Sequence, residues 1–152
     1  MATNGVYRRI VVPVREGPES ERAVRVACSL AADRGASIAA VAVVEIPPLL
    51  PLDAHMDEEE EDARGALRRA QVVADSFGVP LNGCILRARE AATAIVGQAE
   101  SLDAKVVVLG AERRLNGMRR APVLGKTAGA VLKDSPCRVV LVSAGWNGRF
   151  PG

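Results

Sequence analysis

The sequence has few aromatic residues, and this scarcity limits both the core and the partners of the protein. Aromatic residues make up 3% of the 152 residues, while hydrophobic residues together reach 49%, so the core must be built from Val, Leu, Ile and Ala. That composition suits parallel strands covered by helices, because such strands read as continuous aliphatic runs. With a net charge of only +2 and no aromatic patch for base stacking, we expect no nucleic-acid partner.

Cysteine and long apolar runs are also scarce. The three cysteines, Cys28, Cys84 and Cys137, are far apart and odd in number, which favours neither a disulfide framework nor a metal site and suits a reducing compartment. No run approaches the ~20 apolar residues of a membrane span, and the N-terminus lacks the apolar core of a signal peptide. We expect one cytoplasmic domain over residues 1 to 152, without a membrane span and with a frayed tail over residues 144 to 152.

The sequence also has few residues in arrangements that catalysis uses. The one histidine, His55, lies in a proline-rich stretch, where a solvated side chain is the simplest interpretation. No cysteine has a partner base, and Ser20, Ser29 and Ser37 fit a turn, a helix and a strand respectively. The sequence therefore predicts no catalytic residues and no enzyme.

Five aliphatic runs alternate with four amphipathic segments. The runs predict strands over residues 10–14, 37–44, 80–87, 105–110 and 138–142, and the 3.6-residue spacing predicts helices over residues 19–34, 57–77, 92–102 and 126–133. This alternation indicates an α/β fold with an open, five-stranded parallel sheet. Ligands of such sheets bind beyond the carboxyl ends of the strands where strand order reverses, which directs attention to the loops that start at Arg15, Glu45 and Gly110.

Local signals mark the ends of several elements. The acidic run at residues 57–62 is interpreted as the first turn of a helix, where acids complement the positive end of the dipole, rather than as a metal site. Gly35 stands where a helix cap belongs, and Gly78 with Pro80 should end the next helix. Residues 46–52 contain three prolines and are expected to be irregular.

The letters GKT at Gly125, Lys126 and Thr127 resemble the end of a P-loop. A P-loop needs a glycine five residues before Gly125, but that position is Arg120, and fourteen residues separate Gly110 from Gly125. The three spaced glycines of a dinucleotide fingerprint are missing after the first strand. A phosphorelay receiver would place acids where this chain has Arg15 and Arg87.

Positive charge gathers before the last helix instead. Five basic residues with only Glu112 opposing them lie in this segment: Arg113, Arg114, Arg119, Arg120 and Lys126. Backbone amides at the helix start near Gly125 would add their dipole, which is how helix N-termini hold phosphates. The alternative is a solvated basic loop in which Gly125 serves backbone geometry.

In these segments the chain resembles the universal stress protein family. The resemblance runs from IVVPV through VAVVE and VVVLG to GKTAGAVLKDSPCRVVLV and covers about residues 6 to 143. It implies an open parallel sheet of order 3-2-1-4-5 with four helices on both faces, the nucleotide-binding alpha hydrolase-like fold. It also implies a homodimer paired through the last strand and, as in many members, ATP in the crevice at the switch point.

The family's ATP pattern is Gly, two residues, Gly, nine residues, then Gly with Ser or Thr. Gly110 matches the first glycine, Arg113 stands at the second, and Gly125 matches the third after a loop that is two residues longer. Lys126 replaces the hydroxyl residue, which Thr127 supplies one position later. The resemblance further places Arg15 where members carry an aspartate against the nucleotide, and Val43 where a valine touches the base. The implied contact residues are therefore Arg15, Val43, Gly110, Arg113, Gly125, Lys126 and Thr127.

The sequence leaves several functions open. The first is a non-catalytic module of the stress response that responds to ATP, AMP or another adenine nucleotide, or to a different phosphorylated ligand admitted by the added arginines. The second is a ligand-free homodimeric interaction domain. Slow ATP hydrolysis is a third reading, against which the absent aspartate and general base argue. The last segment also resembles stress-protein domains appended to amino-acid permeases and cation antiporters, which implies a membrane transporter or a regulatory protein as partner.

Overall fold

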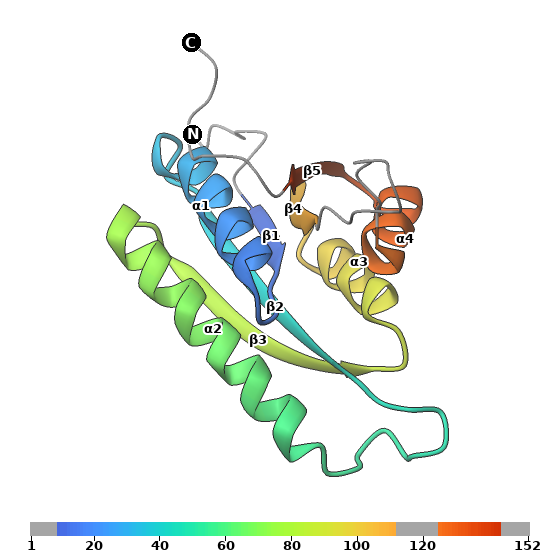
Figure 1. Ribbon diagram of the computed structural model, residues 1–152. Helices are drawn as coiled ribbons and strands as arrows, with labels where there is room; N and C mark the ends of the chain where they lie inside the picture. The colour runs from blue at the N-terminus through green and yellow to red at the C-terminus, as the bar shows by residue number, and fades with distance from the viewer. Residues whose placement is uncertain (1–8, 112–124, 144–152) are drawn as a thin grey trace, which may run out of the picture.

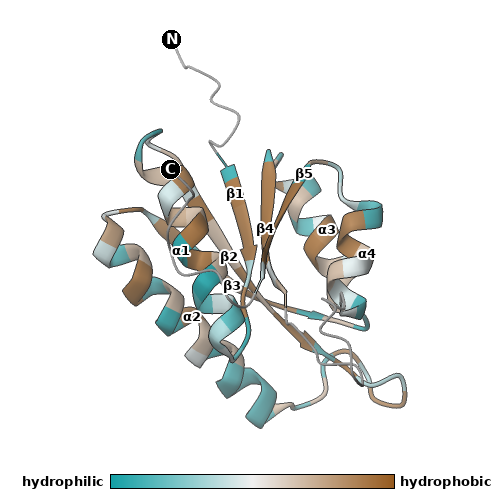
Figure 2. Ribbon diagram, turned by 45° about the horizontal axis from the view of Figure 1, so that its top comes forward, coloured by the Kyte–Doolittle hydropathy of each residue, from teal (hydrophilic) through white to brown (hydrophobic). Residues whose placement is uncertain are grey.

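Two helices cover each face of a five-stranded parallel sheet (Figures 1 and 2). The computed structural model describes residues 9–111 and 125–143. The strands are β1 (Arg9–Pro13), β2 (Ser37–Glu45), β3 (Leu81–Ala88), β4 (Val106–Ala111) and β5 (Arg138–Ser143), and the helices are α1 (Pro18–Ala32), α2 (Asp57–Phe77), α3 (Ala91–Ser101) and α4 (Lys126–Asp134). Strand order is β3-β2-β1-β4-β5, and every pair is parallel. The predicted fold class and strand order are confirmed.

The central strands send alternate side chains into two cores. Ile10 and Val12 of β1 face α1 and α2, whereas Val11 between them faces α3 and α4. All three side chains are fully buried, which is why the strand reads as an unbroken aliphatic run. Figure 2 shows these central strands as brown ribbons between helices in which brown and teal residues are mixed.

Most predicted element ends are confirmed within one or two residues. The acids Asp57 to Glu60 form the first turn of α2, and α1 begins one residue early because Pro18 suits the first helical turn. Gly78 caps α2 in the left-handed conformation, with φ of 67°. The prediction for Gly35 is confirmed: after Asp33 this glycine ends α1 in the left-handed conformation, with φ of 62°. The Ala36 amide donates across it to the Ala31 carbonyl at 3.3 Å, as the Val79 amide does to Ala74 across Gly78.

Within residues 9–111 and 125–143, no helix is long and apolar enough to cross a bilayer. The same residues contain no cluster of three or more His, Cys, Asp or Glu side chains that could hold a metal ion.

Candidate functional site

The strand order reverses between β1 and β4, because β2 and β3 lie beyond β1 while β5 lies beyond β4. Helix α1 follows β1 and packs on one face, and α4 precedes β5 and packs on the other. Both helices run against the parallel strands, so each begins toward the carboxyl edge of the sheet. The first turns of the two helices carry backbone amides without intrahelical partners and the positive ends of the helix dipoles. This edge is therefore suited to an anion.

Gly110 marks how closely α1 approaches the end of β4. A Cβ atom on Gly110 would lie 2.4 Å from the carbonyl oxygen of Glu19 and 2.7 Å from its carbonyl carbon, well inside van der Waals contact. Only glycine fits at this position while the first turn of α1 stays where it is. The sequence indicated Gly110 as a nucleotide contact; the structure gives the glycine a reason in helix packing as well.

At Gly125, the described residues show no packing contact that requires a glycine. This residue is the N-cap of α4, with φ of −64° and ψ of 164°, an extended conformation that any residue adopts. Among the described residues, a Cβ atom there would meet nothing within 4 Å. Its carbonyl accepts the Gly129 amide at 3.0 Å, which closes the first turn of the helix.

Lys126 and Thr127 are the first two residues of α4, as the sequence predicted. Lys126 is exposed and Thr127 is half-buried. The N-cap Gly125 offers no side-chain cap, and no described side chain is hydrogen-bonded to the first-turn amides, which lack intrahelical partners.

Helix α3 has a side chain bound at its N-terminus, which the sequence did not predict. The Ala91 amide at the start of α3 donates to Oε2 of Glu45 at 2.9 Å, so a carboxylate from the end of β2 already occupies that helix N-terminus. Glu45 stands 46 positions before Ala91, and no local pattern links the two. An anion arriving at this edge would therefore favour α4 over α3.

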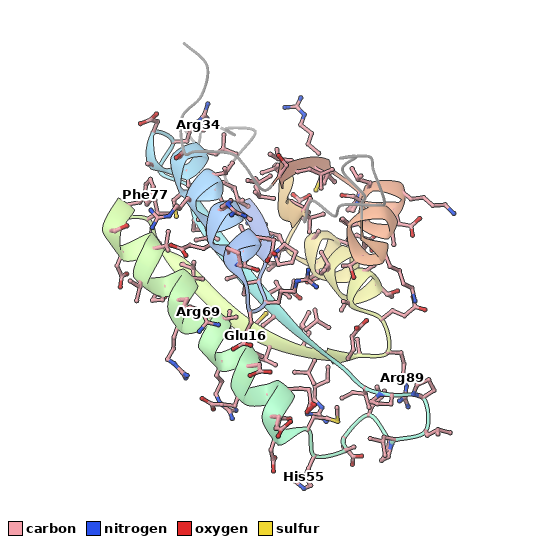
Figure 3. All side chains as sticks on the ribbon, viewed as in Figure 1. Glu16, Arg34, His55, Arg69, Phe77 and Arg89 are labelled. Atoms are coloured by element: carbon pink, nitrogen blue, oxygen red, sulfur yellow. The ribbon has the colours of Figure 1, made fainter. Side chains whose placement is uncertain are left out.

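Val43 and Arg15 belong to opposite faces of the sheet. Val43 of β2 is half-buried against the core beneath α3 and α4. Arg15 lines a hollow of about 230 Å³ between α1 and α2, together with Arg69 of α2. Figure 3 shows Arg69 beside Glu16, and their charged groups lie 3.7 Å apart. The structure therefore does not bring these two predicted contact residues to one face: Arg15 lies towards α2, and Val43 lies beneath α3 and α4.

The backbone of Arg15 is fixed locally. Its amide donates to Oγ of Ser20 at 2.8 Å, which ties the end of β1 to the first turn of α1. Ser20 thus serves the turn, as the sequence indicated. The remaining predicted contact, Arg113, and its basic neighbours Arg114, Arg119 and Arg120 lie outside the described residues.

The comparison with protein families decides the identity of this fold. The family model described as "Universal stress protein family" matches residues 6–143. The chain belongs to the universal stress protein family. It is 29% identical over 143 residues to Universal stress protein MJ0531 of Methanocaldococcus jannaschii, across 90% of this chain and 82% of that protein.

Solved structures of family members share the fold. The universal stress protein from Archaeoglobus fulgidus in complex with dAMP superposes with a TM-score of 0.69 at 23% identity, over 90% of this chain and 98% of that chain. A universal stress protein in complex with cAMP gives a TM-score of 0.70 at 20% identity, over 91% of this chain and 98% of that chain. Adenine nucleotides are therefore ligands of some proteins with this fold.

Proposed function

We propose that this universal stress protein binds an adenine nucleotide at the crevice between β1 and β4, with the phosphate on the N-terminus of α4. The observation that carries the proposal is Gly125. Its backbone is extended and a Cβ would meet no described atom within 4 Å, so among residues 9–111 and 125–143 neither conformation nor packing requires a glycine here. Close approach of a ligand to the backbone does.

Charge and precedent add to this support. Lys126 is the exposed first residue of α4, and its positive charge and the helix dipole both favour a phosphate near the helix N-terminus. Two proteins of the same fold have been solved with dAMP and cAMP. In our proposal Val43 lines the base side, Gly110 borders the crevice, and the amides of Lys126 and Thr127 hold the phosphate.

Calorimetry of the purified full chain tests this proposal directly. The panel is ATP, AMP, dAMP and cAMP, with GTP to test base preference, and mass spectrometry identifies any nucleotide released when fresh protein is denatured. We expect saturable binding of at least one adenine nucleotide. No heat and no thermal shift across the panel at millimolar concentrations would overturn the proposal and favour a ligand-free domain.

A homodimer through β5 is a second part of the proposal. In the described part of the chain β5 pairs only with β4, so its other edge is unpaired there. The strand carries apolar side chains on both faces: Leu141, which is 36% exposed, and half-buried Val139 and Val140. An unpaired apolar edge strand is a template for pairing with a second copy. Light scattering after gel filtration should give twice the chain mass, and Leu141→Lys should shift the mass towards the monomer. A monomeric wild-type protein would rule this dimer out.

We further propose a regulatory rather than an enzymatic role, in the cytoplasm, with a membrane transporter or a regulatory protein as the eventual partner. The proposal follows from the lack of a general base in the sequence and the family resemblance. A phosphate-release assay with ATP tests the non-catalytic part. Sustained release above that of a Lys126→Glu variant would show turnover and contradict it.

A further inference from the structure

Two arginines from the end of β3 and the segment after it hold the segment between β2 and α2 in one conformation. We call residues 46–56 of this segment the leucine loop. Nη1 of Arg89 donates to the carbonyl oxygens of Ile46, Pro47 and Leu50, at 3.4, 2.6 and 2.7 Å. Figure 3 shows Arg89 reaching into this loop. One guanidinium thus binds three backbone carbonyls of the first half of the loop.

Arg87 holds the second half. Its Nε donates to the Leu52 carbonyl at 2.9 Å, its Nη2 to the Ala54 carbonyl, and its Nη1 pairs with Glu60 of α2. The loop contains two turns of its own, closed by the amides of Leu50 and Ala54, each of which donates to the carbonyl of a proline three residues earlier. Proline at a turn also lowers the conformational entropy of the unfolded chain. The arginine hydrogen bonds, the two closed turns and the prolines together hold the loop in one conformation.

This rigid loop exposes three leucines. Leu49 is 97% exposed, Leu52 52% and Leu50 40%, within four consecutive positions. Single exposed apolar side chains are ordinary, but a cluster on an ordered, protruding loop marks an interaction site. Fixing the loop beforehand lowers the entropy lost on binding, which raises the affinity that a small apolar surface can reach.

Exposed acids flank the leucines and determine what could cover them. Asp53 lies in the loop itself, and Asp57, Glu58 and Glu59 follow at the start of α2, all four exposed. An anionic lipid surface would be repelled by this charge, and so would the same loop of a second copy. A groove bordered by Lys and Arg would be attracted to these acids, and its affinity for the loop would fall as the salt concentration rises.

We propose that the leucine loop is a docking element that inserts into an apolar pocket of another protein whose rim carries Lys and Arg. The loop lies on the β3 side of the sheet, at the opposite edge from β5 (Figure 1). Docking there leaves the β5 edge accessible, so the inference does not depend on the proposed dimer. Its test requires no bound nucleotide.

Site-specific photo-crosslinking tests the proposal. A benzophenone amino acid replaces Leu49 in the full chain, expressed in the source cells, and the control carries it at Val72, which is 69% exposed on α2. The protein crosslinked at position 49 is identified and purified, and its affinity for the unmodified chain is measured. We expect an adduct specific to position 49, and Leu49→Ser with Leu52→Ser should weaken binding at least about ten-fold, with Val72→Ser unchanged.

Charge supplies the second test. Glu58→Lys with Glu59→Lys should weaken the complex several-fold and flatten its salt dependence, with circular dichroism and melting temperature as checks of folding. The proposal is overturned if position 49 gives no adduct beyond that of position 72, or if the adduct is a second copy of this chain. It is also overturned if the leucine or the acid substitutions leave the affinity for the crosslinked protein unchanged. The same holds if the protein co-floats with phosphatidylcholine or phosphatidylglycerol vesicles and the leucine substitutions abolish that binding.

Discussion

The backbone of Glu19 lies against the Cα of Gly110, so closely that a Cβ at position 110 would stand 2.4 Å from the Glu19 carbonyl oxygen. This contact joins the first turn of α1 to the end of β4 at the edge of the sheet where strand order reverses. Because both sides of the contact are backbone, no flexible side chain can move aside to relieve the steric clash that a larger residue at position 110 would cause.

Gly110→Ala should therefore destabilise the protein by about 1–3 kcal/mol, the usual cost of overpacking a close contact. Urea unfolding followed by circular dichroism measures the change. The matched control is Gly97→Ala in α3, where a Cβ would meet nothing described within 4 Å. There alanine should raise the free energy of unfolding by about 0.5–1 kcal/mol, because its helix propensity is higher than that of glycine. Equal effects of the two substitutions would contradict the contact.

Lys126→Glu should weaken binding of an adenine nucleotide by at least about five-fold, because it puts a negative charge beside the amides expected to hold the phosphate. Lys133→Glu is the control, since Lys133 lies in the last turn of the same helix. Calorimetry with the best ligand of the panel compares the two variants. If both variants lose affinity alike, net charge rather than the N-terminus of α4 governs binding.

Arg89→Ala should loosen the leucine loop, since three backbone carbonyls lose their donor. We expect a loss of about 1–2 kcal/mol in unfolding free energy and faster amide exchange at Leu50, whose N–H closes the first turn of the loop. Arg68→Ala, which removes an exposed pair with Glu61, should cost no more than about 0.5 kcal/mol. Unchanged exchange at Leu50 in Arg89→Ala would show that the prolines alone hold the loop.

The buried thiol of Cys28 makes the free energy of unfolding depend on pH in the alkaline range. Burial raises the pKa of Cys28 from 9.0 to about 11, against a smaller lowering by the charge of Arg25. Between these values the unfolded chain releases its thiol proton while the folded chain keeps it, so the unfolding free energy falls as pH rises from 9 to 11. At about 1.4 kcal/mol per pH unit, the loss approaches about 3 kcal/mol.

Comparison with Cys28→Ala isolates this effect from the other groups that titrate at high pH. The difference in unfolding free energy between wild type and variant should be constant up to pH 8.5 and then change steadily in favour of the variant. A difference that stays flat up to pH 11 would show that the Cys28 thiol ionises alike in both states.

Local patterns in the sequence were sufficient for the elements and the fold class. The aliphatic run at residues 10–14 and the acidic run at residues 57–62 are read from neighbours along the chain, and both the strand β1 and the first turn of α2 are where these patterns predict. Hydrophobic periodicity reports which face of an element is buried, and a parallel sheet follows from the alternation of strands and helices. The start of α4 at Lys126 was predictable for the same reason.

The tertiary structure decided which distant residues meet. Glu45 caps α3 across 46 positions, and Arg87 holds Leu52 across 35; neither pairing has a local signal, because any exposed acid or arginine fits its own segment equally well. Gly110 was recognisable as a glycine of the family pattern, but its contact with Glu19 exists only once α1 has packed on the sheet. Periodicity along the chain determines the elements, whereas hydrogen bonds and close packing depend on distances through space that only folding creates.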